Sequence, residues 1–370
     1  MRGLAYRLML LLLFTGTLYA QDSNPPKGRF SGLMFGDYYY NIQRDGNFSS
    51  IPNAASASAA PGLTAMQAFQ FRRIYFMYEY DISEKFTTRF RLEADQGTDV
   101  LASGKISDFV KDAYIKWKNV FTGSDLIFGI QPPPAYEISE AAWGYRSLEK
   151  TIMDVRGIVS SRDQGLSLKG KLTDDGMFNY WVMFANNSGN SPATTKYKRY
   201  YAHIHVKPMT NLQITLYGDY KAQPEIADPY HAGGSLSNSV ITTALFAGYN
   251  DPGNFSLGAE GFLQSTQNGF NNGTSVASKS AIGLSFWATY NFQSDLAIVG
   301  RYDNYDPNTD GSVSGDVRNY IIGGLDWKVD KNVSIEPNVL YESYQAPSGG
   351  TAPDASVTGR LTFYYVFLPN

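Results

Sequence analysis

The sequence contains no cysteine in 370 residues. A chain without cysteine has no disulfide and no thiol chemistry, so any β-structure in it must close by hydrogen bonding alone. Long hydrophobic runs are missing too: after residue 20, no stretch approaches the roughly 18 apolar residues that mark a transmembrane helix. The sequence also lacks a phosphate-cradling Gly-rich loop and a helix-borne metal motif. A membrane helix and the commonest cofactor sites are therefore not expected.

An excess of basic charge is also absent. Of the 31 basic residues, Arg2 and Arg7 lie in the first 20 positions, which contain no acid. The rest of the chain therefore has 29 basic residues against 34 acidic ones, a balance of −5. Nucleic-acid binding usually requires a basic patch. The mild acidity argues against a nucleic-acid partner.

The first 20 residues have the pattern of a secretory signal peptide. Arg2 and Arg7 form a basic n-region, residues 8–14 an apolar h-region, and Ala20 is a small residue at the expected cleavage site. The apolar run is too short to span a bilayer. We therefore expect residues 1–20 to be removed on export and residues 21–370 to form one domain; a buried N-terminal helix is the alternative.

The chain is rich in aromatic residues and glycine, and apolar and polar residues alternate along many of its segments. It contains 27 Tyr, 22 Phe and 35 Gly, with 18% charged residues. In FTTRFRLEADQ (86–96), Phe90 and Leu92 fall on one side of an extended chain, and Arg91 and Glu93 on the other. About sixteen such segments occur, each near the ~9–11 residues of a membrane-crossing strand. The clearest cover 86–96, 107–118, 165–172, 197–207, 211–221, 254–264, 295–303 and 358–367.

The connections between these segments alternate between short and long. Short turns rich in Asp, Asn, Gly and Lys, such as 81–85 and 173–176, are typical of tight hairpins. A β-sandwich would have no reason to place every long loop at one end. The pattern predicts a barrel with short periplasmic turns and long extracellular loops. The long loops are expected at 41–66, 96–106, 131–162, 187–196, 222–238, 265–278, 305–316 and 345–355.

Charged residues on the polar side of the strands are expected to face a water-filled lumen. A barrel of about sixteen strands is wide enough to hold water, and rings of lumen charge set ion preference in such pores. Two interpretations stay open: a tuned anion path, or a hydrated wall of compensating pairs. The candidate residues are the bases Arg73, Arg89, Arg91, Lys169, Lys171 and Arg199 and the acids Glu93, Asp95 and Asp112.

The longest loop, 131–162, is the candidate constriction. Three prolines force an extended exit from the preceding strand, and from Ser139 onward the spacing of Leu148, Ile152 and Val155 favours a short helix. A loop this long is usually functional or disordered. We expect it to fold into the lumen; an extracellular cap is the alternative. The charged candidates here are Arg146, Glu149, Lys150, Asp154, Arg156, Arg162 and, at the following strand, Asp163.

Around this loop the sequence resembles the phosphate-selective porin O/P family. The resemblance covers residues 66–185 and is seen in IFGIQPPPAYE (127–137), YRSLEK (145–150), MDVRG (153–157) and SRDQGLSLKG (161–170), and in the earlier segment 71–95. It implies an outer-membrane pore whose anion path is lined by arginines. The positions that match are Arg73, Arg89, Arg91, Arg146, Arg156 and Arg162, with acids interleaved.

Two other classes of function are open to an exported β-barrel, an enzyme and a closed structural barrel. An outer-membrane phospholipase or protease needs a histidine beside a nucleophile or an acid, and the chain offers only His203, His205 and His231. His203 and His205 share a strand face at a spacing that can bind a metal, but no third ligand is apparent, so we interpret them as polar lumen residues. A closed structural or adhesive barrel would instead bind a partner through loops such as 41–66, where the tract 51–65 is typical of a mobile loop.

The sequence thus predicts an all-β protein, a transmembrane antiparallel barrel in the outer membrane of a Gram-negative-type bacterium. Its predicted function is that of a porin, a water-filled channel for passive diffusion of small hydrophilic solutes, with anion preference as the finer hypothesis. It is not expected to be an enzyme or to need a cofactor. The expected partners are outer-membrane lipid and small solutes or anions, and porins of this size often form homotrimers.

Overall fold

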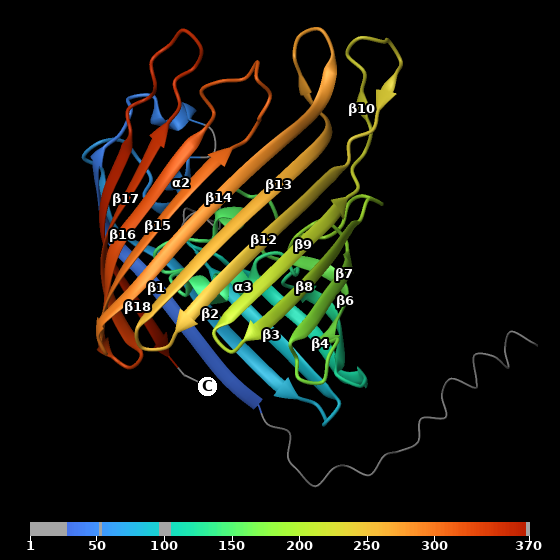
Figure 1. The fold of residues 1–370 in the computed structure, drawn as a ribbon, viewed down its shortest axis with the longest axis vertical. Coiled ribbons are helices and arrows are strands. Elements are labelled where there is room, and N and C mark those ends of the chain that lie inside the picture. The colour runs from blue at the N-terminus through green and yellow to red at the C-terminus, as the bar shows by residue number, and fades with distance from the viewer. Residues whose placement is uncertain (1–27, 52–53, 96–104, 368–370) are drawn as a thin grey trace, which may run out of the picture.

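The chain forms a closed antiparallel β-barrel (Figure 1). The computed structural model describes residues 28–51, 54–95 and 105–367. The predicted signal peptide, 1–20, lies outside these residues. Each strand of the wall pairs with its neighbours in sequence, and β1 closes the ring by pairing with β18. The predicted fold class, a barrel of about 16 strands, is confirmed.

The wall contains sixteen strands. A separate hairpin of β10 (Ile226–Ala227) and β11 (Ser235–Leu236) lies in the loop between β9 and β12. The wall strands are β1 (Gly28–Gln43), β2 (Gln67–Asp81), β3 (Phe86–Ala94), β4 (Asp108–Phe121), β5 (Ser124–Gln131), β6 (Asp163–Lys171), β7 (Phe178–Ala185), β8 (Arg199–Met209), β9 (Leu212–Lys221), β12 (Val240–Asp251), β13 (Phe255–Asn271), β14 (Val276–Gln293), β15 (Leu296–Asp306), β16 (Arg318–Asp330), β17 (Val333–Tyr344) and β18 (Ser356–Phe367).

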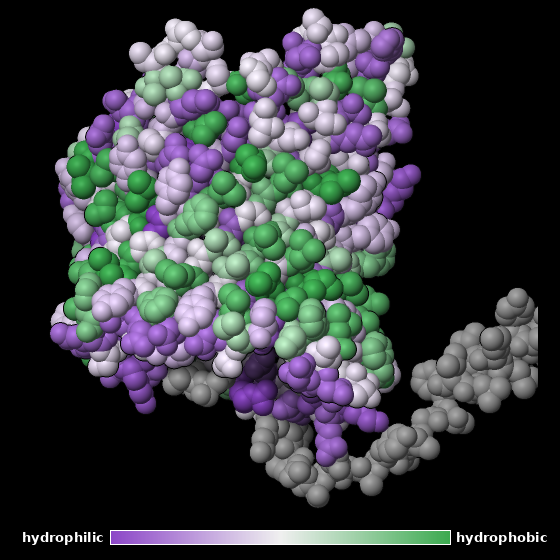
Figure 2. Space-filling view, viewed as in Figure 1, coloured by the Kyte–Doolittle hydropathy of each residue, from purple (hydrophilic) through white to green (hydrophobic). Residues whose placement is uncertain are grey.

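Alternation along each strand separates an outer apolar face from an inner polar one. On β3, Phe90 is 41% exposed on the outside, whereas Glu93 is 2% exposed within the barrel. Figure 2 shows hydrophobic side chains gathered in a band across the outer face, with polar residues above and below. A closed sheet pairs its backbone groups without leaving an edge, which is what a hydrocarbon surrounding demands.

One predicted long loop is wrong. The sequence predicts a loop at 265–278, but β13 runs to Asn271 and β14 begins at Val276, so only a four-residue turn remains. Pairs such as Thr266 with Lys279 continue the ladder beyond the apolar band. Where both faces of a strand meet water, the apolar–polar alternation disappears although the backbone pairing does not. Sequence alternation therefore marks the part of a strand within the band, not its end.

The loop 131–162, called the inner loop below, lies within the ring of strands (Figure 1). It carries the helices α3 (Glu137–Trp143) and α4 (Ile152–Val155). Trp143, Leu148 and Ile152 are at most 1% exposed. They pack against apolar and aromatic side chains on the inner face of one part of the wall, among them Phe246, Phe262, Trp287, Val299, Tyr305, Tyr320, Ile322 and Leu340.

The single helix predicted through Leu148, Ile152 and Val155 is replaced by two shorter ones. Gly144 adopts a left-handed conformation, with φ of 72°, and ends α3. Leu148 lies between the helices, where it reaches the wall from a turn. Among the described residues, no helix is long and apolar enough to cross a membrane.

The loop after β1 also enters the barrel. This α2 loop (residues 44–66) carries a 3₁₀ turn, η1 (Phe48–Ser50), and α2 (Ala55–Ala59). The sequence predicts a mobile segment at 51–65, but Ala55, Ser56 and Ala59 are at most 2% exposed. Glu342 of β17 accepts hydrogen bonds from the backbone N–H groups of Ala55 and Ser56, each at 3.2 Å. Small side chains let this segment approach the wall closely enough to be held there.

The contact between the wall and the inner loop can be tested at a glycine. Gly258 lies opposite Trp287, and a Cβ at position 258 would lie 2.2 Å from that ring. Trp287 in turn packs on Trp143, with ring centroids 5.7 Å apart. Gly258→Ala should displace Trp287 and destabilise the barrel by about 1–3 kcal/mol, as overpacking does. The measurement is thermal unfolding of the refolded protein in detergent. Gly300→Ala, where a Cβ meets no atom within 4 Å, should leave the melting temperature unchanged; equal melting temperatures for the two variants would contradict this packing.

Candidate functional site

Two β-bulges place extra basic residues inside the barrel. On β2, Phe35 pairs with Arg73 and Gly36 with Phe71, so Arg72 is an extra residue in the ladder. A bulge lets consecutive side chains point to the same side, whereas a regular strand alternates them. Arg72 and Arg73 both reach inward: Arg72 donates to the carbonyl oxygen of Ser147 in the inner loop at 2.6 Å, and Arg73 pairs with Glu93 across 2.6 Å.

Strand β4 has a bulge of the same kind. Arg91 pairs with Asp112 and Leu92 with Val110, which leaves Lys111 as the extra residue. Lys111 and Asp112 are both buried within the barrel, at 5% and 0% exposure. The apolar–polar alternation of the sequence predicts that Asp112 faces the lumen. It does not predict that Lys111 and Arg72 face the lumen as well. The available signal was a charged doublet in the middle of a strand, because one member of such a pair would otherwise face lipid.

The wall carboxylates lie deeper than the bases that they pair. Asp112 is fully buried and forms an ion pair with Arg91, whose side chain is 20% exposed, across 3.2 Å. Glu93, 2% exposed, pairs with Lys111 at 2.9 Å as well as with Arg73. Arg89 is 26% exposed and pairs with Glu79 at 2.6 Å. The basic ends therefore project toward the lumen, and most of the negative charge sits behind them.

The inner loop presents its own charges opposite this wall. Arg146 pairs with Glu140 and Asp154, each at 2.7 Å, and Arg162 pairs with the wall residue Asp112. Burial disfavours charge on Arg146, but the two carboxylates outweigh it and raise its pKa. Burial raises the pKa of Glu140 despite Arg146 beside it. For Asp154 the attraction to Arg146 outweighs burial and lowers the pKa to about 2.

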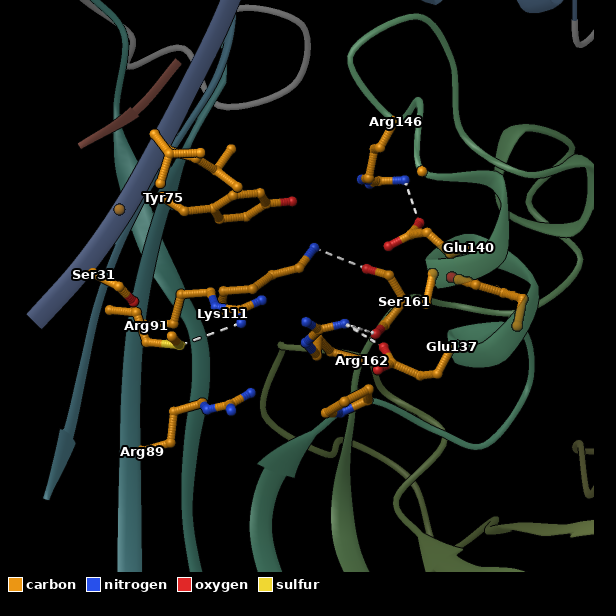
Figure 3. Close-up of a pocket in the computed structure, with 18 residues that line it drawn as sticks. Ser31, Tyr75, Arg89, Arg91, Lys111, Glu137, Glu140, Arg146, Ser161 and Arg162 are labelled. Atoms are coloured by element: carbon orange, nitrogen blue, oxygen red, sulfur yellow. Dashed lines mark hydrogen bonds and ion pairs between the residues drawn. The ribbon is translucent and has the colours of Figure 1, made fainter. Parts of the chain in front are cut away.

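A cavity of about 580 Å³ separates the wall from the inner loop. In Figure 3, Arg89, Arg91 and Lys111 point into it from the wall, and Arg146, Arg162, Glu137 and Glu140 from the loop. We call it the eyelet cavity. Its charged lining thus comprises five bases and two acids. Within the described residues, the five bases pair in all with six carboxylates, four of which do not line the cavity.

The structure brings four of the predicted site residues into the lining of this cavity, namely Arg89, Arg91, Arg146 and Arg162. Three predicted acids, Glu93, Asp112 and Asp154, pair with bases of the lining, and the others lie away from it. Asp95 pairs with Arg73 at 3.0 Å. Lys169 and Lys171 line a separate cavity near the turn between β6 and β7, together with His203 and His205. Glu149 and Lys150 line a neighbouring cavity, Arg156 pairs with Glu342, Asp163 accepts from the Tyr201 hydroxyl, and Arg199 pairs with Asp219.

His203 and His205 do lie together, with stacked rings 6.2 Å apart. Within the part of the chain that the structure describes, no group of three or more His, Cys, Asp or Glu residues could hold a metal ion. The interpretation of the two histidines as polar lumen residues is consistent with this geometry.

No protein-family profile matches the chain, and no curated protein sequence matches it. Solved structures do. The anion-selective porin from Comamonas acidovorans aligns with a TM-score of 0.62 at 12% identity, over 93% of this chain and 100% of that porin. The outer-membrane channel DcaP of Acinetobacter baumannii aligns with 0.63 at 12% identity, over 94% and 99%.

OmpF of Salmonella typhi aligns with a TM-score of 0.60 at 15% identity, over 92% of this chain and 98% of that one. The chain has the fold of an outer-membrane porin. At these identities the likeness establishes the porin fold alone. The finer resemblance to phosphate-selective porins stays a prediction.

The raised pKa of Glu140 predicts a pH-dependent selectivity. A glutamate with a raised pKa gains its proton at a higher pH than usual, while Asp154, with a pKa of about 2, keeps its charge beside Arg146. Acidification should therefore remove negative charge from the eyelet cavity at a higher pH than an ordinary glutamate would and increase anion preference, since lining charge sets ion preference. Reversal potentials under a salt gradient measure this.

Glu140→Gln is the matched variant, because it removes the same charge at every pH. It should show at neutral pH the anion preference that the unchanged protein reaches only on acidification, with little further change as the pH is lowered. If the reversal potential of the unchanged protein shifts with pH no more than that of Glu140→Gln, the assignment to Glu140 is contradicted.

Proposed function

We propose that this chain is an outer-membrane porin that allows passive diffusion of small hydrophilic solutes and prefers anions. The observation that carries the proposal is the lining of the eyelet cavity, in which five bases face the space and most of their carboxylate partners lie behind them. The porin fold and the structural likeness to the anion-selective porin from Comamonas acidovorans support it. Outer-membrane location and assembly as a homotrimer belong to the same proposal.

The electrostatic reasoning depends on distance. Two unit charges 4 Å apart interact by about 1 kcal/mol in water, and by more where the surroundings are less polar. An ion crossing the eyelet cavity passes the guanidinium groups of Arg89 and Arg91 before it comes as close to Asp112, which is fully buried. An anion is therefore attracted more than the total charge of the network would suggest.

The test is single-channel recording of the refolded protein in a planar bilayer under a salt gradient. The double variant Arg89→Gln with Arg91→Gln should still conduct, and its anion-to-cation permeability ratio should fall about fivefold or more, since about 1 kcal/mol per exposed charge is lost. Lys331→Gln, in the exposed turn between β16 and β17, removes a base away from the eyelet cavity and should leave the ratio unchanged.

Each outcome has a distinct meaning. Conductance with an unchanged permeability ratio in the double variant would contradict anion selection at this cavity and leave a general porin. No conductance in the unchanged protein would contradict the porin function and favour a closed structural barrel, in which the inner loop and the α2 loop act as a plug.

A further inference from the structure

A second cavity, of about 480 Å³, adjoins the eyelet cavity, and Arg146 lines both. Strands β1 and β2, the α2 loop and the inner loop each contribute to its lining. Its volume lies within the roughly 300–1,000 Å³ of sites that bind small molecules. We call it the vestibule cavity.

One side of the vestibule cavity is apolar. Phe35 and Tyr39 of β1 line it together with Ala57, Pro61 and Met66 of the α2 loop. Contact with such a surface favours a solute with an apolar body by about 25 cal/mol per Å² removed from water. A small inorganic anion has no apolar surface to bury, so it gains nothing from this side of the cavity.

The other side carries a lysine that no carboxylate pairs directly. Among the described residues, the ammonium group of Lys150 forms no ion pair or hydrogen bond. The two acids that its charge stabilises are engaged with other groups: Glu149, 1% exposed, accepts from the Tyr320 hydroxyl at 3.1 Å, and Asp154 pairs with Arg146 at 2.7 Å. Asp95, which also lines the cavity, pairs with Arg73 at 3.0 Å. The lining therefore offers a solute a cation that no carboxylate contacts directly.

The apolar side is held in place before any solute arrives. The carbonyl oxygen of Pro61 accepts from the Tyr39 hydroxyl at 3.1 Å and from Asn41 Nδ2 at 3.0 Å. Glu342 holds the start of α2 through the N–H groups of Ala55 and Ser56. A surface fixed in this way loses little conformational entropy on binding.

We propose that the vestibule cavity is a binding subsite for small organic anions. A carboxylate would pair with Lys150, and an apolar body of about the size of a benzene ring would pack against Ala57, Pro61 and Met66, beside the buried rings of Phe35 and Tyr39. The inference rests on the proposed porin function, since the subsite adjoins the eyelet cavity, and it narrows the preferred solutes from anions in general to organic carboxylates.

The experiment compares benzoate with acetate as additives during single-channel recording in potassium chloride. Benzoate should cause blocks that last several-fold longer than those of acetate at the same concentration.

Lys150→Gln should shorten the benzoate blocks about tenfold, because a hydrogen bond to a charged group contributes about 1.5–3 kcal/mol. Met66→Gln, which keeps the length of an exposed side chain, should shorten benzoate blocks and leave acetate blocks unchanged. Lys85→Gln, in the exposed turn between β2 and β3, is the control.

Saturation-transfer NMR of benzoate with the detergent-solubilised protein gives a second readout that does not need an open channel. Signal from benzoate that weakens in Lys150→Gln and Met66→Gln, but not in Lys85→Gln, supports the subsite. Benzoate blocks no longer than those of acetate, in a channel that conducts and prefers anions, would overturn the subsite and leave the porin function standing. A protein that does not conduct would overturn the porin function, and the NMR comparison would still decide whether the subsite exists.

Discussion

The pairing of β1 with β18 is the constraint on which the rest of the structure depends. Hydrocarbon offers no hydrogen-bond partner to a peptide group, and a chain without cysteine has no covalent means of closing a sheet. The ladder from Gly32–Phe367 to Gln43–Val357 removes both edges at once. Once the sheet is closed, each side chain of the wall points either into the barrel or out of it. The barrel also encloses a space that the loops can fill.

The way in which the loops fill that space follows from the side chains on the inner face of the wall. Strands β12 to β17 carry large apolar and aromatic residues on their inner face, among them Phe246, Trp287 and Tyr320, and these would meet water in an empty lumen. The inner loop covers them with Trp143 and Leu148. Strands β2 to β4, whose charged side chains line the eyelet cavity, face the opposite side of the loop, so the cavity forms between these strands and the loop.

Sequence alternation predicted the barrel because lipid imposes it wherever a strand crosses the apolar band, as at Phe90 and Glu93. The prediction from alternation is wrong where a strand does not contact lipid or where its pairing is irregular. The strands around 265–278 continue into water, where no pattern is required, and Lys111 lies at a bulge that changes the period by one residue. The burial of 55–59 depends on Glu342, nearly 300 residues later, so no local pattern could reveal it.

The same long-range geometry explains how an acidic chain can have a basic passage. A buried carboxylate without a partner is strongly destabilised, and the two deep acids beside the eyelet cavity each have several bases around them. Glu93 pairs with Arg73 and Lys111, and Asp112 pairs with Arg89, Arg91 and Arg162. Charges more than about 8 Å away are largely screened at physiological salt, so an ion in the passage responds to the side chains that line it, five bases and two acids at the eyelet cavity, and not to the balance of −5 over residues 21–370. Arg72 and Lys111 are present in the lumen only because of the two bulges, so the charge that a solute meets depends on strand register as much as on composition.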